Sequence, residues 1–382
     1  MQRNRLAVNF YFLVNGFIYA NWVARLPKLQ EVYGMDNGTT GLVLLTYAIG
    51  ALVAMPFTGW LIVKNGSERT TVIASFLFCA MVPFFAVMNS VLLLAVLLFI
   101  TGMFTGVMDV AMNAQAVLVE EAYKRPIMSS FHAVFSGGMM IGAGAGSLFT
   151  KWETPLFQHF LIMAIIALLF ATWSSFNLLK DAPTGEDATE EGGFQLPSRA
   201  LWGMGVIAFC CMLGEGAMAD WSTIYMQNIA KADPVLAPIG LGAFSGAMMV
   251  GRIFGDKGRE ILGDGKLMII NSLVALLGVL LLILFPVPIM VILGLFLVGL
   301  GLSVIVPIAY STAGSAEGLA PGVGISMVTT IGYSGFLFGP PVIGFIADWQ
   351  TLRIAMFFVA LLFLVMTGLT LWNNTRQGKT SN

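Results

Sequence analysis

The chain has 382 residues, of which 58% are hydrophobic and 10% are charged, and its net charge is −1. This composition lies far outside the range of a soluble domain, so we expect the chain to lie in a lipid bilayer. The small net charge gives no sign of a nucleic-acid partner.

Apolar windows long enough to cross a bilayer recur along the whole chain. A helix needs about 20 apolar residues to span the hydrocarbon core, and these windows are too long and too continuously apolar for barrel strands. The first window follows Arg3 and Arg5 but lacks a small-residue cleavage site, so we interpret it as a membrane helix and not as a signal peptide. Twelve windows are predicted to be transmembrane helices, at about residues 6–26, 39–62, 70–88, 91–117, 128–150, 156–179, 200–228, 238–256, 266–285, 288–313, 321–347 and 352–374.

The distribution of basic residues predicts the orientation. If both termini lie in the cytoplasm, the inner loops and tails hold 14 of the 19 Lys and Arg residues and the outer loops hold 5. Cytoplasmic loops of membrane proteins are enriched in these residues. We therefore expect a multi-pass protein of the inner membrane with both termini cytoplasmic.

The first helix carries polar side chains within an apolar run. Asn15 and Tyr19 lie inside the window and are candidates for substrate binding. Asn21 and Trp22 lie near its outer end, where we expect Asn21 to cap or gate the path. Trp22 is either an interfacial anchor, a common role for Trp at that depth, or a cavity-lining residue.

The fourth and fifth helices contain the first intramembrane acid. A carboxylate in hydrocarbon costs several kcal/mol unless it is paired, solvated or protonated, so such an acid is a candidate functional residue. A hairpin that turns near residue 122 places Asn113 level with His132, and Asp109 level with Ser136. Asp109 and His132 are then about 6 Å apart in depth. We expect Asp109 to carry the coupling proton, His132 to be its partner or relay, and Asn113 and Ser136 to contact substrate. A structural cluster that ties the two helices together is the alternative.

The only long polar stretch follows the sixth window. Residues 180–199 are predicted to form a cytoplasmic linker between an N-terminal bundle, residues 1–179, and a C-terminal bundle, residues 200–382. An internal repeat at an offset of 198 to 199 residues relates the two bundles. Its matches include Asn21-Trp22 with Asp220-Trp221 and Phe135-Ser136-Gly137 with Tyr333-Ser334-Gly335.

The seventh helix carries the other two intramembrane acids. Glu215 lies near its middle with Ser222 on the same face, so we expect both to face the cavity and Glu215 to bind substrate or a proton. Asp220 points elsewhere, nearer the outer end, and is expected to cap or gate that end. Trp221 has the same two interpretations as Trp22.

The later helices add hydroxyl and aromatic groups. Tyr310, Thr330 and Tyr333 lie in the tenth and eleventh windows. Rings that stack on apolar faces and groups that bind hydroxyls suit a sugar or polyol. Each residue taken singly is also explained as an ordinary helix contact.

Five runs of sequence resemble those of a known family. Together they resemble the bacterial fucose-permease-like branch of the major facilitator superfamily, which includes a rhizopine-transport protein. The runs are residues 21–27, 109–120, 130–136, 215–222 and 339–344. The resemblance implies an all-α membrane protein whose twelve transmembrane helices form two pseudo-symmetric six-helix bundles. It also implies alternating access by a monomer, with proton coupling.

The superfamily also has a characteristic loop between helices 2 and 3, with a Gly followed four residues later by an Asp. Here Gly59 is followed at that point by Val63, whereas the second bundle keeps a partial version that includes Arg252 and Asp256. These two residues are therefore expected to gate the inner end. We expect Arg252 to pair with a cytoplasmic acid or to reach the interface.

Enzymatic activity is not expected, because the sequence has no HExxH motif and no nucleophile elbow, and only two histidines. Nor is a cofactor or a metal expected. Without a P-loop, an ion gradient must supply the energy. We predict proton-coupled symport of a small polar solute, sugar-like or polyol-like. Export of a metabolite or drug-like compound by proton antiport is the alternative, although the glycine-rich run 137–146 lacks the proline common in antiporters.

Overall fold

The structure is a computed structural model, and it describes residues 2–125, 127–180, 201–316 and 321–380. Within these residues, twelve helical spans are long and apolar enough to cross a membrane, which confirms the predicted number. The first six are formed by α1 (Gln2–Val23), α3 (Asn37–Asn65), α4 (Ser67–Met81) with η1 (Val82–Ala86), α5 (Val91–Tyr123), α6 (Met128–Lys151) and α7 (Leu156–Ser175). The second six are formed by α8 (Trp202–Asn228), α9 (Ala237–Leu262), α10 (Asp264–Leu284), α11 (Pro288–Leu302) with α12 (Ile305–Gly314), α13 (Pro321–Trp349) and α14 (Leu352–Thr380). The predicted linker, residues 180–199, lies outside the described residues except for Lys180.

Two features of the helices were not predicted. A short helix, α2 (Leu26–Tyr33), follows the first span and ends at Gly34, whose φ of 62° suits glycine. The tenth span is broken into α11 and α12. Pro307 explains the break, because a proline ring clashes with the carbonyl four residues earlier, here that of Ser303.

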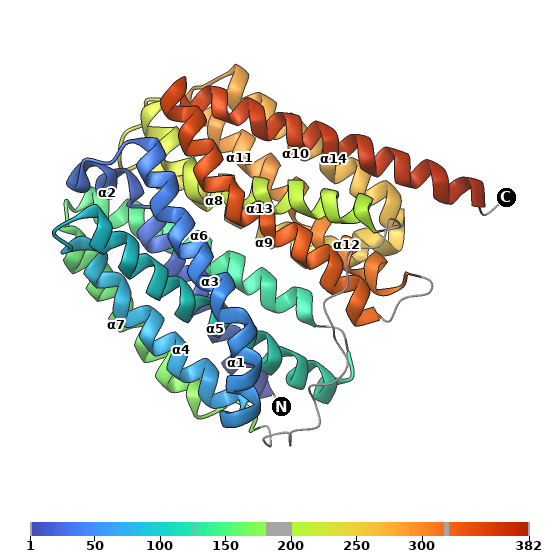
Figure 1. Cartoon of the computed structure of the whole chain (residues 1–382), viewed down its shortest axis with the longest axis horizontal. Coiled ribbons are helices and arrows are strands. Elements are labelled where there is room, and N and C mark those ends of the chain that lie inside the picture. Colours follow the sequence, from blue (N-terminus) through green and yellow to red (C-terminus); the bar gives the residue numbers. More distant parts are fainter. Residues whose placement is uncertain (1, 126, 181–200, 317–320, 381–382) are drawn as a thin grey trace.

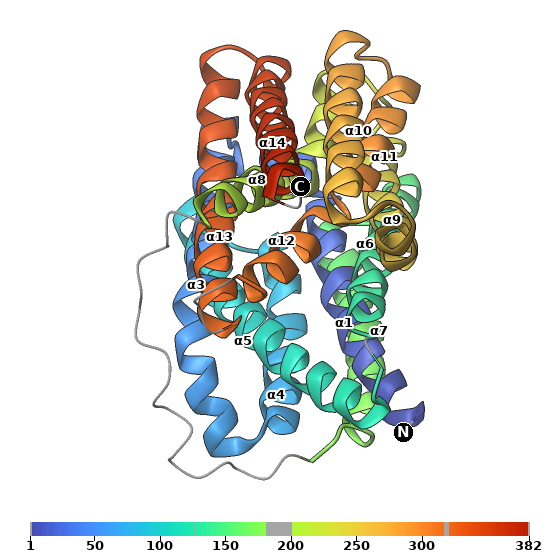
Figure 2. The ribbon, with the colours of Figure 1, turned by 90° about the vertical axis from the view of Figure 1, so that its right-hand side faces the viewer.

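The two sets of six helices pack in the same pattern. In the first set, α1 packs on α6 and α3 on α5, and in the second, α8 packs on α13 and α9 on α11. These pairs correspond under the sequence repeat. The sets, called here the N half and the C half, meet through α6 with α9 and through α3 with α13. In Figure 2 most of the C half lies above the N half, and the halves overlap where α9 passes beside α6 and α13 beside α3.

Glycines allow the closest helix contacts within each half. A Cβ on Gly138 would overlap the backbone oxygen of Leu13, and a Cβ on Gly335 would overlap that of Phe209. The two contacts join corresponding pairs of helices, α6 with α1 and α13 with α8. Small residues allow such approach in membranes, where helices associate through packing rather than through the hydrophobic effect.

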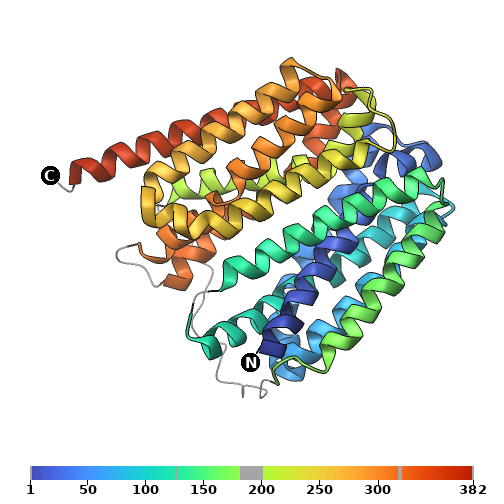
Figure 3. The same cartoon turned by 180° about the vertical axis from the view of Figure 1, so that it is seen from behind.

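The halves are joined at the end of the molecule opposite the termini. There, the Asp348 carboxylate on α13 accepts hydrogen bonds from the backbone N–H groups of Asn37 (3.0 Å) and Gly38 (2.6 Å), which begin α3. The Ser147 hydroxyl donates to the Val235 carbonyl at 2.6 Å. We call this end the joined end. Toward the other end, where both termini lie, the halves diverge (Figures 1 and 3).

Candidate functional site

A cavity of about 250 Å³ lies between the two halves. Carboxylates, aromatic rings and a few neutral polar groups form much of its wall. From the N half it is lined by Asn15, Tyr19, Trp22, Tyr47, Thr105 and Asp109 among others, and from the C half by Glu215, Asp220, Tyr333 and Phe336 among others. A second pocket of about 500 Å³ shares Asp109, Glu215 and Tyr333 and continues toward the termini through His132, Arg252, Asp256 and Tyr310. The shared residues connect the centre of the molecule to the diverging end.

Asp109 lies where the two pockets meet. Its carboxylate accepts a hydrogen bond from the Asn113 amide at 3.3 Å, and the same amide donates to the Asp109 carbonyl at 2.8 Å. The spacing of four residues on α5 brings the two side chains to one face. Among the described residues, no Lys or Arg forms an ion pair with Asp109. Its charge therefore has only a neutral partner.

His132 does not pair directly with Asp109. Within the described residues, no hydrogen bond joins the two side chains, and the His132 imidazole packs edge-on against Phe12 at 5.3 Å between ring centroids. Both side chains do line the pocket on the side of the termini. The role of His132 as partner or relay stays a prediction.

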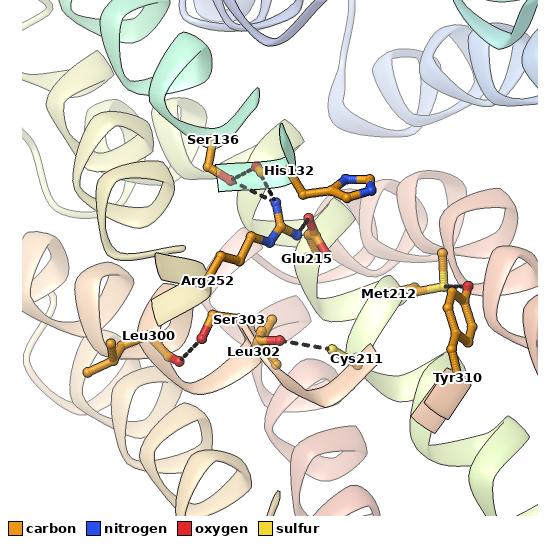
Figure 4. A network of polar contacts seen from close by, with 10 residues as sticks. All are labelled: His132, Ser136, Cys211, Met212, Glu215, Arg252, Leu300, Leu302, Ser303 and Tyr310. Atoms are coloured by element: carbon orange, nitrogen blue, oxygen red, sulfur yellow. Dashed lines mark hydrogen bonds and ion pairs between the residues drawn. The ribbon is translucent and has the colours of Figure 1, made fainter. Parts of the chain in front are cut away.

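Glu215 and Arg252 form an ion pair within the membrane-spanning region. Guanidinium Nη2 lies 3.2 Å from the Glu215 carboxylate, and the two side chains are only 20% and 14% exposed. Nη1 donates across the gap between halves to the Ser136 hydroxyl at 2.7 Å and to the His132 carbonyl at 3.3 Å (Figure 4). One guanidinium thus neutralises the C-half acid and also binds the N half.

The prediction that Arg252 pairs with a cytoplasmic acid or reaches the interface is wrong. The helix explains the error: α9 continues to Leu262, beyond the predicted end at residue 256. Arg252 therefore lies ten residues before the helix end, about 15 Å along its axis. The Arg252 side chain is only 14% exposed, so its charge needs a partner close by.

Asp220 also faces the central cavity, and the Tyr19 hydroxyl donates to its carboxylate at 2.5 Å across the two halves. Asp220 is 6% exposed. Its predicted place on a gate remains a proposal, but it lies at the wall of the central cavity and is not confined to the outer end. Trp22 lines the same wall, whereas Trp221 is buried inside the C half. Both indoles are at most 1% exposed, so the interpretation of these residues as interfacial anchors is wrong.

The remaining candidates divide into those that line a central pocket and those that do not. Ser222 borders a small separate pocket inside the C half, next to Tyr225. Thr330 is exposed and bonds to the carbonyl of Ser326. Asn21 is buried and pairs with the His159 imidazole at 3.0 Å, so it differs in its contacts from its repeat partner Asp220. Asn113 bonds to Asp109 and Ser136 to Arg252, while Asn15, Tyr310, Tyr333 and Asp256 line one or both pockets.

Several residues of the site were missed from the sequence. Tyr47 and Thr105 bond to each other at 3.0 Å in the cavity wall. Asp348, one residue beyond the predicted end of its window, looked like a loop residue, yet it joins the halves. Arg25 is buried near His159, and this burial lowers the pKa of its guanidinium. The only sign in the sequence that Arg25 is part of the site was its position in the run 21–27, directly after a helix.

Comparison with known proteins identifies the family to which this chain is similar. The family model described as Major Facilitator Superfamily matches residues 8–317. An uncharacterized MFS-type transporter of Yersinia pestis is 32% identical over 95% of this chain and 94% of its own length. The membrane protein MosC of Rhizobium meliloti is 32% identical over 98% of this chain and 91% of its own length.

Two solved structures share the fold. The nucleoside transporter NupG has a TM-score of 0.73 with 11% identity, covering 97% of this chain and 99% of its own. A bacterial homolog of the human lysosomal transporter Spinster, solved in an inward-facing and occupied conformation, has a TM-score of 0.70 with 12% identity, covering 97% and 96%. At such low identity these likenesses show the fold alone.

Proposed function

This chain belongs to the major facilitator superfamily of transporters, and from its central cavity we propose that it is a proton-coupled symporter of a small hydroxylated solute. The proposal rests on which group each of the three cavity carboxylates bonds to. Glu215 has a guanidinium partner, whereas Asp109 has an amide and Asp220 a phenol. A carboxylate that faces a membrane cavity without a cation is stabilised when it takes up a proton.

Asp109 is the proposed site of the coupling proton. It lines both the central cavity and the pocket that continues toward the termini. Its neutral partner, Asn113, can bond to either the charged or the protonated carboxyl group. A proton bound there would therefore connect the solute cavity with the diverging end of the molecule.

The neutral groups of the cavity support a hydroxylated solute. Asn15, Tyr47 and Thr105 offer donors and acceptors, and Tyr333 and Phe336 offer aromatic faces on the other side. Aromatic rings stack on the apolar faces of a sugar ring while amides and hydroxyls bind its oxygens. Apolar side chains such as Leu52, Met55 and Met139 make up much of the wall, so the proposal of a sugar or polyol rests on these few polar groups and rings.

We assign the diverging end to the cytoplasm, because the distribution of basic residues predicts that both termini lie there. The structure then represents the inward-facing state of an inner-membrane transporter that works as a monomer. Asp348 and Ser147 hold the periplasmic end closed. Opening of that end would break these contacts, while closure of the cytoplasmic end would bring α12 and α13 toward the N half.

Uptake into proteoliposomes with an imposed pH gradient tests the proposal. Sugars and polyols are screened against the wild type, against Asp109→Asn and against Thr330→Ala, a matched control outside the cavity. We expect gradient-driven accumulation with the wild type and the control. Asp109→Asn should lose accumulation but keep exchange of solute across the membrane. Gradient-driven loss of preloaded solute, without accumulation, would instead support the exporter alternative.

A further inference from the structure

Arg25 holds a buried positive charge that has no acidic partner. It is only 7% exposed, and among the described residues no Asp or Glu forms an ion pair with it. Its guanidinium donates to the Thr154 carbonyl at 3.3 Å and lies 3.4 Å from Nδ1 of His159. Because a guanidinium can only donate, Nδ1 accepts, and the Nε2–H of a neutral imidazole is directed to Asn21 Oδ1 at 3.0 Å. Both partners of Arg25 are therefore uncharged, and a buried charge of this kind is costly.

A pocket of about 360 Å³ lies beside Arg25 at the joined end. The helix that follows Arg25, α2, lies at this end of the molecule (Figure 1). Both halves form the wall, because Arg25 belongs to the N half and Thr223 to α8 of the C half. Pro234 also lines the pocket, directly before the Val235 carbonyl that bonds to Ser147. The pocket shares no lining residue with the central cavity and is a separate site.

Thr223 adds a second observation that points to a ligand. It is 1% exposed, and its hydroxyl has no hydrogen-bond partner among the described residues. A threonine in a helix can instead donate to the carbonyl four residues earlier, as Thr150 of the same pocket does to Gly146 at 2.8 Å. A buried hydroxyl without a partner is costly. The pocket thus combines an uncompensated guanidinium from one half with a free hydroxyl donor from the other.

The acids of the pocket restrict the kind of anion that can bind. The Glu31 carboxylate is paired with Lys28 at 2.6 Å, so these two charges neutralise each other. Glu153 is exposed and forms no ion pair among the described residues. Its charge repels a divalent anion twice as strongly as a monovalent one. A small anion with a single charge is therefore the ligand that suits the guanidinium of Arg25 and the hydroxyl of Thr223.

We propose that Arg25 and Thr223 bind a small monovalent anion such as chloride at the joined end of the molecule. Because the two donors belong to different halves, the bound anion holds the halves together there. It stabilises the closed joined end and is released when that end opens. The site is separate from the central cavity, so the proposal does not depend on which solute the cavity carries or on proton coupling.

A chloride titration tests the site. The purified full chain in lipid nanodiscs is titrated with sodium chloride at neutral pH, while sodium gluconate keeps the ionic strength constant. Binding is measured from the broadening of the chloride NMR signal and from the unfolding temperature. That temperature should rise by about 2 °C when the chloride concentration is about tenfold above its dissociation constant. The absence of both effects, or a rise with sodium acetate and none with chloride, would overturn the proposal.

A pair of variants locates the effect in the pocket. Thr223→Val keeps the shape and removes the free hydroxyl, so it should weaken chloride binding at least about fivefold. Without chloride it should be no less stable than the wild type, because the lost hydroxyl has no partner among the described residues. Ser245→Ala is the matched control, since its buried hydroxyl also has no such partner but does not line the pocket. It should keep the wild-type affinity for chloride.

The comparison of these two variants decides the assignment. Equal chloride affinities in Thr223→Val and Ser245→Ala would refute it. Arg25→Gln should abolish the chloride effect on both the NMR signal and the unfolding temperature, and full retention of the effect would also refute the assignment. If Arg25→Gln does not fold, the comparison of Thr223→Val with Ser245→Ala is sufficient.

Discussion

Replacement of Asp348 by alanine should shift the protein toward a state that is open at the joined end. The carboxylate accepts two backbone N–H groups of α3, and its own helix, α13, belongs to the other half. Hydrogen bonds to a charged acceptor contribute about 1.5–3 kcal/mol each when sheltered. Because Asp348 is exposed, solvent screening reduces the combined contribution of the two hydrogen bonds to about 1–2 kcal/mol. Their loss should raise the ratio of molecules open at the joined end to molecules closed there by about 5- to 30-fold.

Asp36 provides a matched control. It also caps α3, with its carboxylate accepting from Thr39 N–H at 2.7 Å, but it belongs to the same half as α3. Asp36→Ala should therefore cost helix stability without opening the joined end. Spin labels at the exposed Val32 and Val287, one in each half, would report the separation of the halves by pulsed electron resonance. Identical distance distributions for Asp348→Ala and Asp36→Ala would refute the reasoning.

Three further outcomes are expected. Gly335→Ala should strongly destabilise the fold because its Cβ meets backbone, whereas Gly144→Ala, with open space, should be neutral or stabilising, as measured by thermal unfolding. Glu215→Gln should lower the free energy of unfolding by roughly 3 kcal/mol because it leaves a sheltered guanidinium without its carboxylate, and unchanged stability would contradict the pairing. The hydrogen bonds of Asp36 with Thr39 lower the pKa of its carboxyl group in the folded state, so its stabilising effect is present above about pH 4 and lost as the pH falls through that lowered value. The difference in unfolding temperature between wild type and Asp36→Ala should accordingly vanish in acid.

The fold could be predicted from the sequence because the bilayer restricts the choices. Each span needs about 20 apolar residues, so the twelve windows predict the number of membrane helices. Their repeat at 198 to 199 residues predicts two related sets of six. The departures from the predicted helices have local causes. Pro307 breaks the tenth span, and the extension of α9 to Leu262 includes charged residues that an apolar window does not capture.

The candidate site was predictable only in part. Asp109, Glu215 and Asp220 could be identified because an acid inside an apolar window is conspicuous, and all three line the central cavity. Their partners could not be identified in the same way. Arg252 reaches Glu215 only when α9 crosses beside α8, and such a contact depends on helix rotation, which residue spacing does not determine.

The aromatic wall was missed for a related reason. Tyr47 lies in an apolar window where a tyrosine is unremarkable, and only the tertiary fold brings its ring on α3 to that of Trp22 on α1. Conversely, Ser222 shares a helical face with Glu215 by spacing but lies inside the C half. A period of 3.6 residues identifies a common face and leaves open what that face contacts.

The central claim is that solute and proton move together through Asp109. Its most direct test is the internal pH of proteoliposomes that contain a trapped pH-sensitive dye, recorded when solute is added outside without any imposed gradient. Symport predicts that the interior becomes acidic with the wild type and with Thr330→Ala, and that Asp109→Asn shows no such change. An interior that becomes alkaline, or an unchanged internal pH while the wild type accumulates labelled solute, would contradict the account.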